Sequence, residues 1–364
     1  MSQVLYRKYR PKTFAEVTGQ EHVVRTLRGA LLNNRIGHAY LFSGPRGVGK
    51  TTMARLLAKA LNCEKRQTAK DKSEPCNKCQ YCLAVNNNNS LDVIEIDAAS
   101  NRGIDEIRNI KESARVAASS GNYKVFIIDE VHMLTPPAFS ALLKTLEEPP
   151  SHVVFILATT EPHKITATIL SRVQRFEYKK LTPEQISTRL TMIAGLEKIK
   201  IDKDAVEAIA ASAEGGLRDA ESSLTKLIAF AGETVTLDHV RQILGIVPTE
   251  VSFIFLASLL KKDTAGSIKA VEGLYDSGIS LDIFVKQFVA YLRFALLLKV
   301  SPNVALEISQ LTAEAEKAVA QLIANTDNDK LIKIMNTMIM LKQELKSSPI
   351  PQLPLELAVI ELTK

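Results

Sequence analysis

The chain has 364 residues, of which 46% are hydrophobic, so it is long enough for two or three domains with apolar cores and too apolar for a disordered protein. Its formal net charge of +6 permits contact with nucleic acid without requiring it. The first fifteen residues carry Arg and Lys where a signal peptide needs an apolar stretch, and charged residues interrupt the apolar segment 281–300. We therefore expect a cytoplasmic protein with no contact to a membrane.

Between residues 39 and 178, short apolar runs alternate with helical patterns. The runs are rich in Val, Ile and Phe, which is typical of strands buried on both faces. Amphipathic patterns lie between them, for example at 51–61 and 138–146. Such alternation predicts an α/β domain over residues 1–178, with a parallel sheet covered by helices on both sides. The predicted strands are 39–43, 92–96, 125–128, 153–158 and 175–178.

The first predicted strand runs directly into a glycine-rich loop that fits G-x-x-x-x-G-K-[ST], and an amphipathic helix follows at once. The glycines allow backbone N–H groups to turn towards phosphate oxygens, and the helix N-terminus adds its positive end. Lys50 is expected to reach the β and γ phosphates of ATP, and Thr51 to bind Mg²⁺ through its hydroxyl. The nucleotide-binding residues predicted here are Gly44, Pro45, Arg46, Gly47, Val48, Gly49, Lys50, Thr51 and Thr52.

Polar side chains follow the third and fourth predicted strands. Asp129 and Glu130 come directly after 125–128, at the strand end where open α/β sheets bind ligands. Asp129 is expected to hold the Mg²⁺ and Glu130 to polarise the attacking water. Thr160 ends the next strand and is expected to position that water, although a strand-end Thr is also an ordinary helix cap.

After Tyr178 the strand pattern stops and only helices are expected. The sequence from Thr182 to Gln185 predicts a capped helix start, and two or three helices then form a lid over residues 179–243. Arg218 lies in the first turn of one of them, where a cation opposes the helix dipole. Its place is explained if its partner is an anion such as a nucleotide phosphate; an ion pair with Asp219 or Glu221 is the alternative.

The remaining block, residues 244–364, carries only helical periodicity. The helices predicted there are 251–260, 265–275, 281–298, 312–323, 330–345 and 355–362.

Four cysteines lie within twenty residues of one another, with the spacing C-x12-C-x2-C-x2-C. Structural disulfides are uncommon in the cytoplasm, whereas four thiolates satisfy tetrahedral Zn²⁺. An iron–sulfur cluster is the alternative, but the spacing differs from that of ferredoxins. We expect a structural zinc module over about residues 62–84, because four ligands leave no open position for catalysis. Its ligands are Cys63, Cys76, Cys79 and Cys82.

Several motifs together resemble the gamma/tau subunits of bacterial DNA polymerase III clamp loaders, which are AAA+ ATPases. They cover the first two blocks densely, and the third block matches mainly by length and by its ending, PLELAVIEL. The motifs are RKYRPKTFAEVTGQEHV at 7–23, HAYLFSGPRGVGKT at 38–51, EIDAAS at 95–100, IIDEVHML at 127–134, ALLKTLEEPP at 141–150 and LATTEP at 157–162.

The resemblance implies roles for residues around the predicted phosphate loop. Thr160 matches the position called sensor 1, and Arg218 matches sensor 2 of the lid. The segment with Arg10 would lie near the adenine, where Tyr6 and Pro11 contact the base. Zinc is implied at the same four cysteines.

Arg172 matches the arginine finger that reaches ATP in a neighbouring subunit. The family usually has Ser-Arg-Cys here, and this chain has Val173 in place of the Cys. Valine keeps a small apolar group, so the role of the arginine is still expected.

The resemblance implies an ATP-hydrolysing motor subunit of a hetero-oligomeric, pentameric ring that opens the sliding clamp and loads it onto primer-template DNA. Residues 244–364 would form its oligomerising collar. Longer family members carry C-terminal domains for the replicative helicase and polymerase, so a short or truncated form is expected. The alternatives are a related AAA+ ring that remodels or unwinds DNA junctions, and a scaffold whose nucleotide site has decayed.

Overall fold

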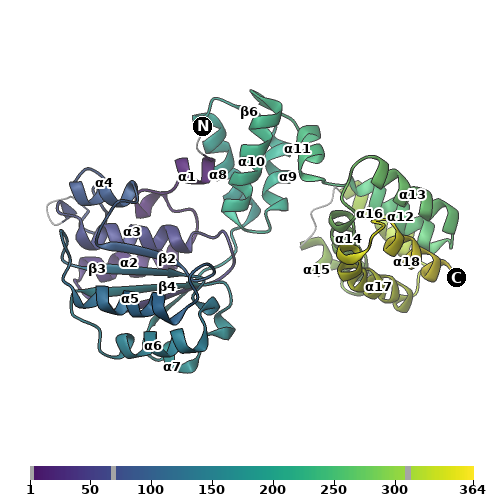
Figure 1. Ribbon diagram of the computed structural model, residues 1–364. Helices are drawn as coiled ribbons and strands as arrows, with labels where there is room; N and C mark the ends of the chain where they lie inside the picture. Colours follow the sequence, from purple (N-terminus) through teal and green to yellow (C-terminus); the bar gives the residue numbers. More distant parts are fainter. Residues whose placement is uncertain (1–3, 67–70, 308–312) are drawn as a thin grey trace. The chain divides into compact units, whose positions relative to one another are not determined.

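A computed structural model describes residues 4–66, 71–307 and 313–364 of the chain. It divides into two compact units, Met1–Thr236 and Leu237–Lys364 (Figure 1). The boundary between a nucleotide-binding domain (1–178) and a lid (179–243) stays a prediction, as does the lid's end at residue 243, which lies within the second unit. The start of the helix predicted at 312–323 lies outside the described residues.

The first unit contains a parallel sheet with the strand order β2-β3-β4-β1-β5. Every residue of β1 and of β4 is buried, as expected for strands covered on both faces. The α/β fold with a parallel sheet is therefore confirmed. The strands are β1 (Ala39–Ser43), β2 (Val93–Asp97), β3 (Lys124–Asp129), β4 (Val153–Thr159) and β5 (Gln174–Glu177).

Helices cover both faces of the sheet (Figure 1). On one face, α2 and α3 pack against alternate strand residues such as Phe42 and Ile127. On the other face, α5, α6 and α7 pack against the residues between them, such as Leu41 and Phe126. Successive strand residues point to opposite faces, so each strand contributes to both cores. The helices are α1 (Leu5–Lys8), α2 (Glu21–Leu32), α3 (Lys50–Asn62), α4 (Gln80–Asn86), α5 (Ile104–Arg115), α6 (Pro136–Glu147) and α7 (Ala167–Leu170).

The strand register brings the polar strand ends together. Asp97 is level with Asp129 across β2 and β3, and Ser43 is level with Thr159 across β1 and β4. The glycine-rich loop leaves β1 at this same edge, because the strands are parallel and share one carboxyl-terminal end. The fold thus places the phosphate loop beside the acidic pair.

The lid region follows β5. Its first helix, α8 (Pro183–Leu196), begins with the predicted capping box of Thr182 and Gln185. The expectation that no strand follows Tyr178 was wrong, since β6 (Lys200–Ile201) and β7 (Thr234–Val235) pair in parallel. Strands of two residues are too short to produce a period-two pattern. The other helices here are α9 (Lys203–Ser212) and α10 (Leu217–Ala231).

The second unit is helical throughout its described part, around an apolar core that includes Phe255, Phe284 and Phe288. The sequence did not predict α15, which is only six residues long. The helices are α11 (Leu237–Leu244), α12 (Thr249–Leu260), α13 (Thr264–Asp276), α14 (Leu281–Val300), α15 (Pro302–Glu307), α16 (Ala313–Ile323), α17 (Asn328–Ser347) and α18 (Leu353–Thr363).

Among the described residues, no single helix has the length and apolar composition of a membrane span. Only α11 and α12 taken as one pair, bent by 56° at their junction, reach that length and composition.

Candidate functional site

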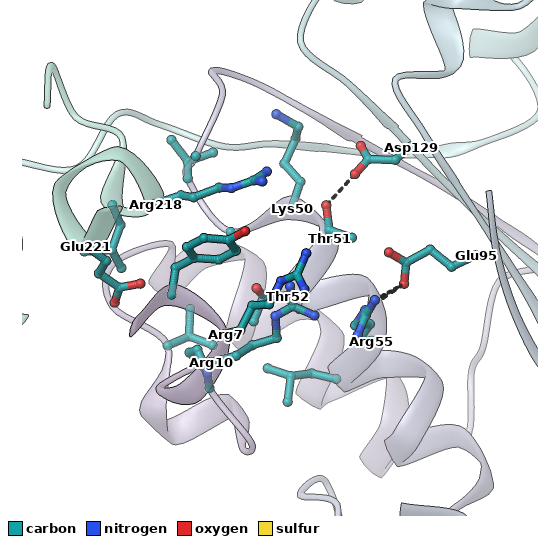
Figure 2. A pocket seen from close by; sticks show the side chains of 18 of the residues that line it. Arg7, Arg10, Lys50, Thr51, Thr52, Arg55, Glu95, Asp129, Arg218 and Glu221 are labelled. Carbon is teal, nitrogen blue, oxygen red and sulfur yellow. Dashed lines mark hydrogen bonds and ion pairs between the residues drawn. The ribbon is translucent and has the colours of Figure 1, made fainter. Parts of the chain in front are cut away.

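A cavity of about 700 Å³ lies between the glycine-rich loop, the N-terminal segment and the start of α10 (Figure 2). This volume is within the range of small-molecule sites. Among the described residues that line it, eight are Lys or Arg and five are Asp or Glu. The excess of positive charge favours an anionic ligand.

The loop adopts a conformation that depends on its glycines. Gly44 has a φ of +143°, and a Cβ there would lie 2.4 Å from the carbonyl oxygen of Tyr178. Gly47, with a φ of +78°, packs against Gly216 of the lid. Gly49 caps the N-terminus of α3, so the first N–H groups of that helix face the loop. This is the cradle that phosphate oxygens require.

Lys50 lies within the loop. Its Nζ donates hydrogen bonds to the carbonyl oxygens of Gly44, at 2.8 Å, and Pro45, at 2.7 Å. Burial lowers the pKa of Lys50, and the nearby carboxylates of Glu130 and Asp129 oppose this effect. The loop carbonyls therefore hold the ammonium group within the loop.

Thr51 and Asp129 meet beside the loop (Figure 2). The Thr51 hydroxyl donates to Oδ2 of Asp129 at 2.7 Å, and Oδ1 of Asp129 accepts from the backbone N–H of Glu130 at 3.0 Å. A hydroxyl and a carboxylate are hard oxygen ligands, which is the donor set that Mg²⁺ prefers beside nucleotide phosphates.

Glu130 is the residue just beyond β3, with a left-handed φ of +48°. Its Oε2 accepts hydrogen bonds from the hydroxyl of Thr160, at 2.9 Å, and from the Thr160 backbone N–H, at 3.2 Å. A non-glycine residue in this conformation stores strain, and such strain is concentrated at functional sites. Thr160, which we expected to position a water, contacts the acid itself.

His132 is a buried neighbour to which the sequence assigned no role. Its Nδ1 lies 3.0 Å from the hydroxyl of Thr159 and 3.5 Å from Oε2 of Glu130. Its Nε2 lies 3.5 Å from Oε1 of Glu161. The signal in the sequence was a histidine two positions after the acidic pair.

Arg218 approaches the cavity from the lid. Its backbone N–H donates to the carbonyl oxygen of Gly47 at 3.2 Å, and its guanidinium lies 4.8 Å from the ring centroid of Tyr6. A hydrogen bond from Arg218 lowers the pKa of Tyr6 more than burial raises it. The alternative ion pair with Glu221 does not form, since Glu221 lies against Arg189 at 3.4 Å.

Further basic residues line the cavity. Burial lowers the pKa of Arg10, and the charge of Arg55 adds to the effect. Arg55, on α3, pairs with Glu95 at 2.6 Å. Arg7 and Arg55 were not predicted as site residues, although Arg55 lies one turn after Thr51 on the same helix. Tyr6 and Pro11 line the cavity, and their contact with a base stays a prediction.

Arg172 is separate from this cavity. Its Nη2 lies 2.8 Å from Oε1 of Glu147, and its Nη1 donates to the carbonyl oxygen of Thr168 at 2.7 Å. About a third of the side chain is exposed.

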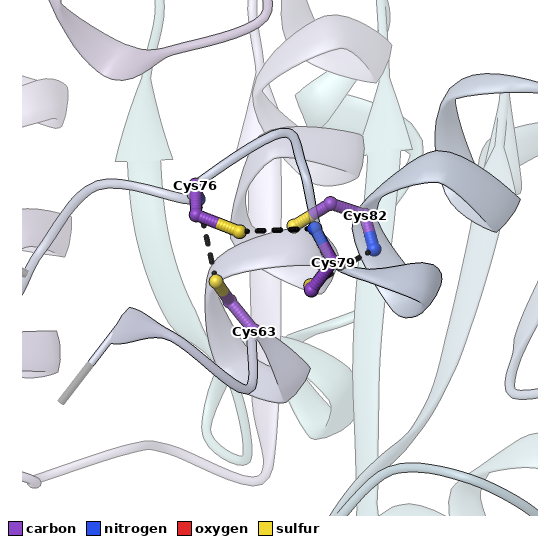
Figure 3. Close-up of side chains that lie close together, drawn as sticks. All are labelled: Cys63, Cys76, Cys79 and Cys82. Atoms are coloured by element: carbon purple, nitrogen blue, oxygen red, sulfur yellow. Dashed lines mark hydrogen bonds between the residues drawn. The ribbon is translucent and has the colours of Figure 1, made fainter. Parts of the chain in front are cut away.

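The four cysteines converge (Figure 3). Their sulfur atoms all lie within 4.8 Å of one another. A tetrahedral ion with Zn–S bonds of about 2.3 Å holds its sulfurs about 4 Å apart, so the set fits a single ion. Cys63 follows the last residue of α3 and Cys79 caps α4, so two helix ends deliver ligands.

The sulfurs are surrounded by N–H donors. Burial raises the pKa of Cys76, but the backbone N–H groups of Lys78 and Cys79 lower it to about 7. Burial raises the pKa values of Cys63 and Cys82. A divalent cation would compensate for the buried charge of four thiolates.

Family models match nearly the whole chain. Residues 19–182 match "DNA polymerase III, delta subunit" and residues 185–233 match "DNA polymerase III clamp loader subunit, ATPase lid domain". Residues 235–364 match "DNA polymerase III subunits gamma and tau domain III". The gamma subunit of Buchnera aphidicola DNA polymerase III is 36% identical over 361 residues, which cover 99% of this chain and 98% of that protein.

The chain belongs to the gamma/tau family of DNA polymerase III clamp loader subunits.

Other members of the gamma/tau family are longer. The tau subunit of Bacillus subtilis is 41% identical over 99% of this chain, which spans 63% of that protein. The tau subunit of Escherichia coli is 42% identical over 82% of this chain and 46% of that protein. A solved structure of the Thermotoga maritima RuvB branch migration motor is 22% identical, with a TM-score of 0.46. The match covers 69% of this chain and 78% of the RuvB chain. This likeness is too weak to support a function.

The structure of this gamma/tau chain gathers most of the predicted site residues. Residues 46–52 of the loop and helix start line one cavity with Asp129, Glu130, Tyr6, Arg10, Pro11 and Arg218, whereas Gly44 and Pro45 do not line it. Thr160 contacts Glu130 from the next strand. Arg172 does not line this cavity and pairs with Glu147 instead.

Proposed function

We propose that this clamp loader subunit binds and hydrolyses ATP as a motor of a hetero-oligomeric, pentameric ring that opens the sliding clamp and loads it onto primer-template DNA. The observation that carries the proposal is the Thr51–Asp129 hydrogen bond beside the glycine-rich loop. It joins the hydroxyl and the carboxylate that would hold Mg²⁺ to the loop that would hold the phosphates.

Within this proposal each cavity residue has a role. Lys50 binds the β and γ phosphates, Thr51 and Asp129 hold the Mg²⁺, and Glu130 orients the attacking water. Magnesium supplies charge neutralisation at the phosphates when it is bound. Tyr6 and Pro11 face the base, and Arg218 adds positive charge from the lid.

Hydrolysis would depend on assembly. Arg172 is proposed to reach the ATP of a neighbouring subunit, where its charge stabilises the transition state. Its ion pair with Glu147 is exposed and therefore weak, so a neighbouring phosphate can replace it at low cost.

The four cysteines are proposed to hold a structural Zn²⁺. The compact arrangement of their sulfurs supports a single ion over an iron–sulfur cluster, whose irons hold their cysteines farther apart. DNA contact through Lys and Arg side chains is also proposed, and it should weaken as the salt concentration rises.

The test is ATP turnover by the reconstituted complex, with and without the sliding clamp and primed DNA. We expect clamp and DNA together to stimulate turnover. Strand separation by this protein alone would instead favour the junction-remodelling alternative, and absence of hydrolysis by the complete assembly would favour the decayed scaffold.

A further inference from the structure

The four-cysteine module, here residues 63–66 and 71–86, reaches the same cavity that the nucleotide is proposed to occupy. Val85 and Asn86 of α4 line that cavity. The N-terminal segment, here residues 4–18, lines it from another side through residues that include Arg10 and Lys12. The module and the segment therefore meet at the cavity wall.

Glu74 of the module holds the N-terminal segment directly. Its Oε2 accepts from the backbone N–H of Phe14 at 2.7 Å, and its Oε1 accepts from that of Ala15 at 3.0 Å. Both carboxylate oxygens are thus used on consecutive amides. Phe14 is 1% exposed and packs in the core beside α2 and α3. Glu74 therefore binds a part of the segment that is anchored in the core.

A second contact is made two residues earlier in the segment. Asn77 lies in the turn between Cys76 and Cys79, and its Nδ2 donates to the carbonyl oxygen of Lys12 at 2.9 Å. The buried Nζ of Lys59 donates to the same carbonyl oxygen at 2.9 Å and to Oδ1 of Asn77 at 2.8 Å. Lys59 belongs to α3, the helix that begins with the phosphate loop.

The other end of the N-terminal segment is tied to the lid. Arg189 of α8 donates to the carbonyl oxygen of Tyr9, and Lys8 pairs with Glu197 at 2.7 Å. Arg10 and Pro11 lie between these ties and those at residues 12–15. Their position in the cavity wall is therefore set from both sides.

Glu74 and Asn77, which hold the N-terminal segment, are next to a cysteine of the metal site. Glu74 lies two residues before Cys76, and Asn77 directly follows it. A bound ion would fix the backbone that carries both side chains. Without it, the four sulfurs, three of them on buried cysteines, have no common partner.

We propose that the four-cysteine module sets nucleotide affinity, with Glu74 and Asn77 as positioning residues that hold the N-terminal segment against the base side of the nucleotide. The inference rests on the proposed function, because it concerns that same cavity. It gives the module a role beyond holding its own fold together.

The experiment compares the dissociation constants of Mg-ATP and Mg-tripolyphosphate for the zinc-loaded full chain, measured by calorimetry. Tripolyphosphate has no adenosine, so its affinity depends on the phosphate loop alone. The affinity of ATP depends also on contacts with its base. In Glu74→Ala the affinity for ATP should fall about tenfold while that for tripolyphosphate stays unchanged. Glu74→Gln, which retains one acceptor oxygen, should lie between wild type and Glu74→Ala. Glu64→Ala, which removes an exposed carboxylate of the same module, is the matched control and should bind both ligands as wild type does.

Removal of zinc from the wild-type chain by a chelator should reproduce the selective loss of ATP affinity, and zinc readdition should restore it. Equal losses for ATP and tripolyphosphate, or no loss in Glu74→Ala, would overturn the inference. In those cases wild type still binds ATP, so the proposed function stands. Failure of wild type itself to bind ATP would overturn the proposed function and this inference with it.

Discussion

The carboxylate of Glu130 is held by Thr160 through two hydrogen bonds, one from the hydroxyl at 2.9 Å and one from the backbone N–H at 3.2 Å. The two residues stand at the ends of adjacent strands, and Glu130 takes a left-handed conformation to make the contact. The acid proposed to orient water is thus fixed by the residue that the resemblance names as a sensor.

Glu130→Gln should abolish hydrolysis without abolishing binding. The amide keeps the shape of the side chain but cannot act as a base, so turnover should fall by about 10²-fold or more. The phosphate loop is untouched, so the dissociation constant of ATP should stay near that of wild type. Single-turnover hydrolysis and equilibrium binding separate the two effects. A variant that hydrolyses at the wild-type rate would remove Glu130 from the proposed mechanism.

Thr160→Val tests the hydroxyl contact. Valine matches the shape of threonine but leaves only the backbone N–H to hold Glu130, so we expect turnover to fall about tenfold with ATP affinity unchanged. Thr160→Ser, which restores a hydroxyl, should recover most of the rate. A valine variant that turns over at the wild-type rate would show that the backbone N–H suffices.

Arg172→Ala should leave ATP affinity intact and remove the turnover stimulated by clamp and DNA in the assembled complex, by about 10³-fold. Glu147→Gln is the matched control, because it breaks the 2.8 Å ion pair but leaves the arginine in place. The control complex should retain its stimulated turnover. Stimulation that survives in the Arg172→Ala complex would contradict a role in trans.

Asp92 provides a pH-dependent contribution to stability. Burial raises its pKa, but hydrogen bonds from the backbone N–H groups of Ser119, Ser120 and Gly121 lower it below the usual value. A lowered carboxyl pKa stabilises the fold above the unfolded-state pKa of about 4, and this contribution is lost as the pH falls through the folded-state pKa.

Asp92→Asn should therefore destabilise the chain by about 1–3 kcal/mol at pH 7, because its amide group would face N–H donors. The difference in free energy of unfolding between variant and wild type should shrink as the pH falls below 4. Thermal unfolding midpoints measured across this range check it. A gap that stays constant down to pH 2 would show that the carboxylate charge does not matter.

The sequence predicted those parts of the molecule whose physical requirements are local. Strands buried on both faces must be apolar throughout, as in 153–158, and a loop with positive φ at Gly47 must carry glycine. The strand-end acids follow from the same logic, because parallel strands share one carboxyl-terminal edge.

Contacts between distant segments could not be predicted in this way. The bond from Asn77 to the carbonyl oxygen of Lys12 involves a backbone group that leaves no mark in the sequence. The place of His132 depends on how two neighbouring strands end. The strand pair β6–β7 is two residues long on each side, too short for any periodic pattern.

The most direct measurement of the central claim is the dissociation constant of Mg-ATP for wild type and for Lys50→Ala. Lys203→Ala, which removes an exposed lysine of the lid, is the charge-matched control. If the loop holds the phosphates, wild type and the control should bind ATP alike, while loss of the Lys50 ammonium should weaken binding at least about tenfold. Equal affinity in Lys50→Ala and wild type would contradict the account.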